Sequence, residues 1–296
     1  QPVYLEAQKN HKLVTGIDAA ALAAFSDTAL REQPGQTIAV LLGRNLKQIE
    51  DWTEDLEFFR GLDPEANPIL TRVLPEIAEL EPDDPRLFER QCDRLAALTT
   101  LIEHLDNPPE DGAMLLLATT PSGLFQHCPD PREMRRKELR LAVGQVLDFQ
   151  EFTATLATKL GYDSEIVCET PGQFAVRGGL VDVYPLNADA PCRIDFFGNE
   201  IESIREFDPT SQRSGRERQS LIIASAPEQM ATESEARLLD FLPERVHWLL
   251  AEPAVLAAEA PRLFNRPENL APPEAHFQTL LNRRAKARDS WTGFCE

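Results

Sequence analysis

Positive charge is scarce in this chain. Its 296 residues include 30 lysines and arginines against 49 aspartates and glutamates, and the formal net charge is −19. Tight, nonspecific binding to a nucleic-acid backbone needs clustered lysines and arginines, so the charge balance argues against that function. An acidic protein can still carry a local positive patch. Six arginines in one stretch either form such a patch or pair with acidic neighbours: Arg177, Arg193, Arg205, Arg213, Arg216 and Arg218.

The sequence also lacks an apolar run of membrane-spanning length and a basic-then-apolar signal peptide. We therefore expect no membrane association, and a cytoplasmic location. The cysteines are few and scattered, which suits a reducing compartment, and Cys168 and Cys192 are expected to be small buried residues. Because the chain begins with Gln rather than Met, we expect it to be part of a longer protein.

No set of residues is spaced for catalysis or metal binding. The five histidines are dispersed and the cysteines have no zinc-like spacing, so we expect no metal site. Neither a Gly-x-Ser-x-Gly element nor a reactive Cys–His signature occurs. These residue patterns therefore point to no catalytic set or metal site.

Apolar periodicity alternates between helix and strand in the first 126 residues. We predict helices over 18–33, 45–60 and 85–104, short buried strands over 37–42 and 113–118, and mainly loop over 61–84. Alternating strands and helices predict an α/β layer with a parallel sheet.

The pattern changes near residue 127. A predicted helix over 148–160 precedes short strand-like runs, which indicates an α+β domain with a largely antiparallel sheet; the runs cover 165–168, 173–176, 180–184, 192–196 and 200–207. After about residue 215 the α/β pattern returns, with strands predicted over 221–224 and 246–250 and helices over 234–241, 253–263 and 274–287. We therefore predict an α/β domain split between residues 1–126 and 216–296, with an α+β domain inserted at 127–215.

The most informative segments lie in the predicted insert. They are FAVRGGLVDVYP at 174–185, CRIDFFGNEIESIREFD at 192–208 and SQRS at 211–214. Two of these strand-like runs place an arginine on their polar side, at Arg177 and Arg193. A sheet that carries arginines and an aromatic residue on one face is a plausible docking surface for another protein.

These segments resemble the UvrA-binding domain shared by UvrB and the transcription-repair coupling factors (Mfd). The sequence R-G-G, where UvrB usually has R-G-D, and the ending S-Q-R-S favour the coupling factors. The close match covers roughly residues 160–214. The resemblance implies an N-terminal UvrB-homology module, in which the UvrA-binding domain is inserted into a degenerate P-loop-NTPase-like domain.

The resemblance also implies a docking site. Arg177, Arg193 and Phe197 match the two arginines and the phenylalanine through which the family's domain docks on UvrA. In Phe196-Phe197 the two side chains point to opposite sheet faces, so that one ring fills the core while the other joins the arginines. Gly178 would let the partner's backbone approach closely.

Purely structural roles are the alternative for the same residues. Arg177 would then form a salt bridge with Asp182 or Glu169. Arg193 would pair with Glu200 or Glu202, and Phe197 would pack in the core. The family resemblance favours the docking role.

The same resemblance implies that a phosphate-binding loop would lie at Val14–Ala20. The residues that bind phosphate and magnesium in such a loop are missing here. Ala19 stands at the lysine position and Ala20 at the Ser/Thr position, while Asp18 replaces a glycine and adds negative charge. Such a loop needs the lysine for the phosphates and the hydroxyl for magnesium. We therefore expect the loop, which retains Gly16, to bind no nucleotide and the chain to need no cofactor.

The resulting functional prediction is a non-catalytic adaptor that recruits UvrA to stalled polymerase in transcription-coupled nucleotide excision repair. RNA polymerase and DNA would be contacted only through domains that lie outside this chain. Two alternatives stay open: a UvrB-like helicase fragment with nucleotide-dependent activity, and a stand-alone protein that competes with UvrB for UvrA.

Overall fold

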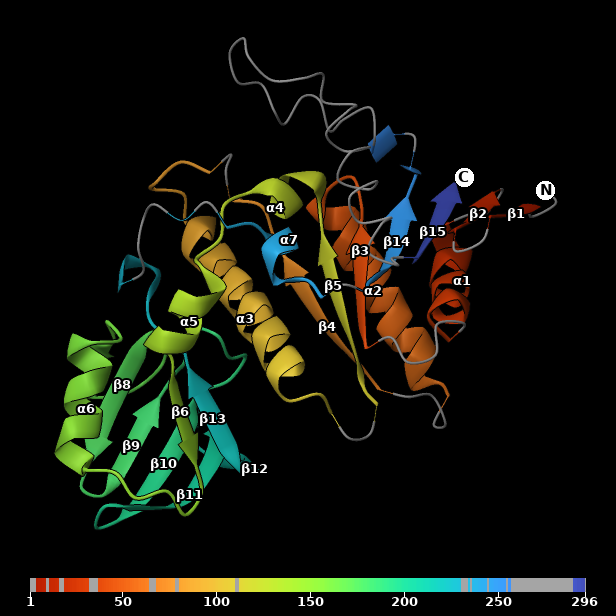
Figure 1. Ribbon diagram of the computed structural model, residues 1–296. Helices are drawn as coiled ribbons and strands as arrows, with labels where there is room; N and C mark the ends of the chain where they lie inside the picture. Colours follow the sequence, from red (N-terminus) through yellow and green to blue (C-terminus); the bar gives the residue numbers. More distant parts are fainter. Residues whose placement is uncertain are drawn as a thin grey trace. The chain divides into compact units, whose positions relative to one another are not determined.

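The computed structural model describes the chain over residues 4–8, 11–15, 19–31, 37–63, 68–77, 80–109, 112–229, 234, 236–243, 245–253, 255–256 and 290–295. The chain divides into two compact units (Figure 1). Unit 1 combines Gln1–Gln126 with Arg237–Glu296, and unit 2 is His127–Ala236.

Unit 1 is built on a sheet that has seven strands in the described part of the chain. Neighbouring strands are parallel except for the first two strands, Tyr4–Gln8 and His11–Thr15, which are antiparallel, so the predicted parallel sheet is confirmed. Across the sheet the order is β1 (Tyr4–Gln8), β2 (His11–Thr15), β15 (Ser290–Cys295), β14 (His247–Ala251), β3 (Ile38–Leu42), β5 (Met114–Thr119) and β4 (Ile69–Leu74).

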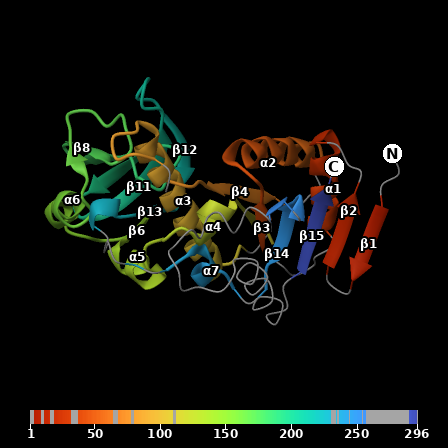
Figure 2. The ribbon, with the colours of Figure 1, turned by 90° about the horizontal axis from the view of Figure 1, so that it is seen from above.

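Helices cover this sheet because each presents an apolar stripe to it. Helices α1 (Ala19–Arg31) and α2 (Leu46–Gly61) lie together on one face of the sheet (Figure 2). On this face Trp52 and Leu56 of α2 pack in one core cluster with alternate residues of the central strands. Helix α2 begins where the Asn45 side chain accepts a hydrogen bond from the backbone N–H of Gln48. The other described helices of unit 1 are α3 (Arg86–Asp106), α4 (Pro121–Phe125) and α7 (Leu238–Phe241).

Most predicted elements of unit 1 are confirmed, but the prediction of mainly loop over 61–84 is wrong. The segment contains β4, the edge strand of the sheet. Most of its side chains are only half-buried, and acidic and proline-rich flanks obscured its pattern. The predicted helix over 274–287 and most of 253–263 lie outside the described residues, whereas α7 is shorter than the helix predicted over 234–241.

Unit 2 contains a second, largely antiparallel sheet, as predicted. Within this sheet, β7 (Asp163–Ser164) and β8 (Gln173–Arg177) run parallel and the other pairs are antiparallel. The strand predicted over 165–168 is wrong, because those residues form no strand and β7 ends just before them. Helix α6 (Phe149–Thr158) begins at Asp148, whose carboxylate accepts a hydrogen bond from the Glu151 N–H. The strand order is β12 (Ser214–Arg218), β11 (Glu200–Phe207), β10 (Cys192–Phe197), β9 (Leu180–Val183), β8 (Gln173–Arg177) and β7 (Asp163–Ser164).

Residues 216–236 belong to unit 2, not to the resumed α/β domain as we predicted. Strand β13 (Ser220–Ile223) pairs with β6 (Leu139–Ala142), and the Tyr162 hydroxyl donates to the Ala224 carbonyl at 2.9 Å. These pairings join segments far apart in the sequence, which periodicity alone does not reveal. Unit 2 also contains α5 (Pro131–Lys137) and the short 3₁₀ helix Pro227–Gln229.

Candidate functional site

The sheet of unit 2 has two chemically different faces. On one face Phe196 packs its ring against Phe149 and Phe152, with centroid separations of 5.2 and 5.5 Å. Because side chains alternate along a strand, Phe197 points to the opposite face, where it is 75% exposed. We call this opposite face the arginine face. Strand register and alternation place on it Arg177, Leu180, Asp182, Arg193, Asp195, Phe197 and Arg205.

Arg193 is held in place by a carboxylate of the neighbouring strand. Its Nε and Nη2 donate to the two carboxylate oxygens of Asp182 at 2.6 and 2.8 Å, and its guanidinium lies 4.8 Å from the centre of the Phe207 ring. The hydrogen bonds to Asp182 raise the pKa of Arg193. The Arg193 side chain is 19% exposed and that of Asp182 only 2%, so the pair is a partly buried ion pair with little free charge.

The partner of Arg193 differs from the structural alternative that the sequence predicted. Antiparallel pairing sets Asp182 directly opposite Arg193, whereas Glu200 lies opposite Phe197 at the far end of the hairpin. Cross-strand neighbours on one face are close enough to interact. The register of β9 against β10 therefore makes Asp182 the ion-pair partner of Arg193, in place of the predicted Glu200 or Glu202.

Arg177 is exposed at the end of β8. Within the described residues it forms no ion pair, and its Nη2 donates a long hydrogen bond of 3.4 Å to the Ile166 carbonyl. The predicted salt bridge with Asp182 is wrong, because Arg193 already occupies that carboxylate; Glu169 does not pair with Arg177 either. The charge of Arg177 is thus available to a partner.

Two glycines shape the turn between β8 and β9. Gly178 has a backbone φ of +64°, which glycine adopts without strain, and a Cβ there would meet nothing within 4 Å. A Cβ on Gly179 would lie 2.9 Å from the Phe196 carbonyl oxygen. Gly179 therefore lets β10 approach closely, while Gly178 is exposed beside Arg177.

Arg205, one of the six clustered arginines, is a further cation of the arginine face. It lies directly opposite Arg193 on β11 and forms no ion pair with any described residue. Its Nη2 donates to the Ser203 hydroxyl at 2.9 Å, and its Nε is buried without a hydrogen-bond partner. The alternation of side chains along β11 could have placed Arg205 on a polar face. Only the register of β10 against β11 shows that Arg205 and Arg193 are neighbours.

The other predicted site is not described by the structure. Gly16 and Asp18 of the degenerate nucleotide loop lie outside the described residues; Ala19 and Ala20 begin α1, but their side chains also lie outside the description. The described residues contain no cluster of three or more side chains able to hold a metal ion. Nor does any described helix have the length and apolar character needed to span a membrane.

Comparison with known proteins supports the sequence resemblance. Residues 139–228 match the family described as the UvrB interaction domain. The resemblance is confirmed. The matched domain contains the whole of the arginine face, including Arg177, Gly178, Arg193 and Phe197.

The chain is also similar to curated transcription-repair coupling factors. It is 26% identical to the Bacillus subtilis protein over 77% of this chain and 18% of that relative. Identity with the Staphylococcus aureus strain Mu50 protein is 29% over the same shares, and with the Myxococcus xanthus protein 32% over 54% of this chain and 13% of the relative. The chain therefore spans about 18% of the length of the first two relatives.

Proposed function

We propose that this chain is a non-catalytic adaptor that binds UvrA through the arginine face of unit 2. In this role it recruits UvrA to sites of stalled transcription during nucleotide excision repair in the cytoplasm. The match to the UvrB interaction domain and the similarity to transcription-repair coupling factors support the proposal. Contacts with RNA polymerase and DNA belong to parts of such proteins that lie outside this chain.

The observation that carries the proposal is the exposure of Phe197 on the same sheet face as Arg177, which forms no ion pair with a described residue. An aromatic ring that is 75% exposed gains free energy when a partner covers it. Aromatic and arginine side chains are also the residue types that dominate binding energy at protein interfaces. Arg177 supplies a planar fork of donors for a carboxylate of UvrA.

The roles within the arginine face are unequal in this proposal. Phe197 is the apolar anchor, and Arg177 is the charge presented to the partner. Arg193 contributes chiefly by holding Asp182 and the β9–β10 register, because its charge is already compensated. Gly178 leaves the turn open, since it projects no side chain towards the partner.

The absence of catalysis is proposed from the sequence of the degenerate loop. Ala19 and Ala20 replace the lysine and the hydroxyl that phosphate and magnesium binding require. We take unit 1, with its parallel sheet, to be a degenerate P-loop-like domain that no longer uses nucleotide. Titration with ATP and magnesium should give no binding heat, and saturable heat would favour the helicase alternative.

The deciding experiment is calorimetric titration of the chain into purified UvrA at moderate salt without nucleotide. We expect saturable binding. Phe197→Ala should weaken it by about 2 kcal/mol, or roughly 30-fold in Kd. Arg177→Ala should cost about 2–5 kcal/mol, because it leaves a partner carboxylate unpaired in the interface.

Matched controls separate this site from general surface effects. Phe58 is 73% exposed and Arg86 lies on an exposed helix end, both in unit 1. Phe58→Ala and Arg86→Ala should bind UvrA like the parent chain. Undiminished binding by both Phe197→Ala and Arg177→Ala would refute the proposed site, and no binding by the parent would refute the proposed function.

A further inference from the structure

A second exposed apolar residue lies in the same cross-strand row as Phe197. Val146, in the loop before α6, is 71% exposed. It forms an isolated antiparallel bridge with Glu200, and Glu200 is the cross-strand partner of Phe197. Directly opposed residues of antiparallel strands project to the same face. Phe197, Glu200 and Val146 therefore form one row at the edge of the arginine face, which we call the tip row.

Backbone hydrogen bonds fix the position of Val146. The Leu147 N–H donates to the Asn199 carbonyl at 2.8 Å, and the Ile201 N–H donates to the Gln145 carbonyl at 2.9 Å. These two bonds flank the Val146–Glu200 pair, which is the arrangement that brings opposed side chains closest together. The row is thus held by the sheet and is presented in a defined geometry to a partner.

The tip row combines two apolar side chains with one carboxylate. Glu200 is exposed and forms no ion pair with any described residue. Phe197 and Val146 flank it on either side, two strand spacings apart, which is about 10 Å. An apolar surface broken by a single unpaired carboxylate fits a partner that presents an apolar side chain beside a lysine or arginine.

We propose that Val146, Glu200 and Phe197 form one continuous docking row for a surface of UvrA that carries a basic group next to an apolar residue. This inference rests on the proposed function. It adds to the arginine face a negative charge, that of Glu200, which would also contact UvrA. The partner surface must then present a carboxylate to Arg177 and a cation to Glu200. That charge pattern determines the orientation in which the two proteins dock, because a rotated partner would bring like charges together.

The test is calorimetric titration of UvrA with the intact chain and its tip-row variants. Val146→Ser removes the apolar contact at an exposed position, and we expect about tenfold weaker binding. Glu200→Lys reverses the charge opposite the partner's cation and should weaken binding by about 30-fold or more. Both variants should unfold within about 2 °C of the parent, because surface substitutions have small effects on stability.

A matched control lies in the same loop. Val143 is 37% exposed and lies outside the tip row. Val143→Ser should bind UvrA as tightly as the parent. If it weakens binding as much as Val146→Ser does, the effect arises from the loop and the inference is wrong.

The outcomes distinguish this inference from the proposed function. If the parent binds and Phe197→Ala does not, while Val146→Ser and Glu200→Lys bind normally, only the docking row is overturned. If the parent itself does not bind UvrA, the proposed function fails and the docking row fails with it. Loss of affinity in both tip-row variants, with Val143→Ser unchanged, supports the row.

Discussion

Asp182 holds the guanidinium of Arg193 in place, and both side chains are largely removed from solvent. Removing one member of a buried ion pair leaves the other charge without compensation. We expect Asp182→Asn to lower the free energy of unfolding of unit 2 by about 2–4 kcal/mol. Urea unfolding followed by circular dichroism would measure the change. A loss below about 0.5 kcal/mol would mean that solvent compensates Arg193 and that the pair is not structural.

Two cysteines of unit 2 should be chemically inert in the folded protein. Burial raises the pKa of Cys168 to about 12 and that of Cys192 to about 11. Since the thiolate is the reactive species, almost none is present at pH 8.

We therefore expect iodoacetamide at pH 8 to leave Cys168 and Cys192 unmodified over a period that labels the half-buried Cys92. Mass spectrometry of the peptides would report each site separately. Urea should make both cysteines reactive, which is the control for reagent access. Rapid native labelling of Cys168 would indicate that the segment around it opens readily.

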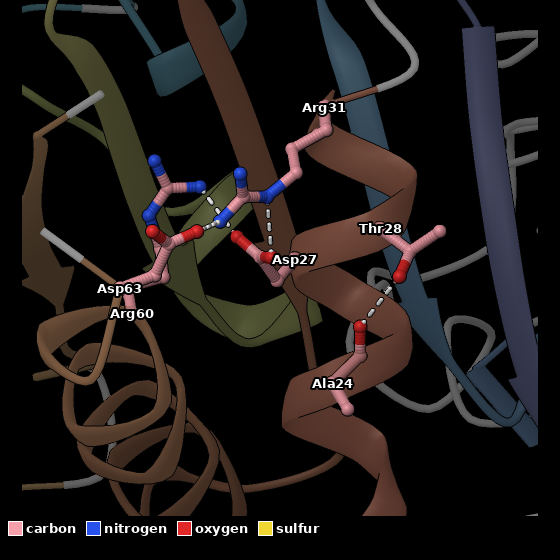
Figure 3. Close-up of polar contacts among 6 residues, drawn as sticks. All are labelled: Ala24, Asp27, Thr28, Arg31, Arg60 and Asp63. Carbon is pink, nitrogen blue, oxygen red and sulfur yellow. Dashed lines mark hydrogen bonds and ion pairs between the residues drawn. The ribbon is translucent and has the colours of Figure 1, made fainter. Parts of the chain in front are cut away.

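At the scale of elements, a charge cluster fastens α1 to α2 (Figure 3). Asp27 of α1 accepts from Arg60 Nη1 of α2 at 2.6 Å and from Arg31 Nε at 2.6 Å. Arg31 in turn donates to Asp63 at 2.8 Å. The Asp27 side chain is 6% exposed and that of Arg60 11%, so one buried carboxylate serves two cations.

Asp27→Ala should therefore destabilise unit 1 by about 3–5 kcal/mol, since it removes the buried carboxylate to which both Arg31 and Arg60 donate. The three tryptophans Trp52, Trp248 and Trp291 all belong to unit 1, so fluorescence during urea unfolding reports this unit. Thr28→Ala is the matched control on the same helix. It removes only an exposed hydroxyl that bonds to the Ala24 carbonyl and should change stability by less than about 0.5 kcal/mol. Equal effects of the two substitutions would contradict a special role for Asp27.

Secondary structure was predictable where apolar periodicity was complete. Strand β3 has five consecutive buried residues, and α2 repeats its apolar positions at helical spacing. The edge strand β4 was missed because its half-buried residues show no clear alternation. Strand β12 was also missed, because all of its side chains are exposed and its sequence therefore has no apolar alternation.

At the scale of the whole molecule, unit 2 begins and ends at neighbouring positions in space. Its two chain ends meet, because the Cys128 N–H donates to the Ala236 carbonyl at 2.7 Å. Neighbouring ends allow a unit to be removed from a longer chain without straining it.

We expect residues 127–236, expressed alone, to fold cooperatively and to bind UvrA with an affinity within about threefold of the whole chain. Dispersed amide resonances and a single sigmoidal urea transition would establish folding. Calorimetry would then compare affinities. A folded fragment that fails to bind would show that unit 1 contributes to the interface.

Local geometry was determined by the sequence alone. Alternation along β10 placed Phe196 and Phe197 on opposite faces, because the direction of a side chain in a strand depends only on its neighbours in the sequence. Tertiary structure decided which charges meet. The register of β9 against β10 set Asp182 opposite Arg193, and Arg177 was left without an ion pair among the described residues. The pairing of Glu200 with both Phe197 and Val146 aligned Val146 with Phe197. Such contacts depend on how distant segments pair around a shared core, and local periodicity carries no information about that pairing.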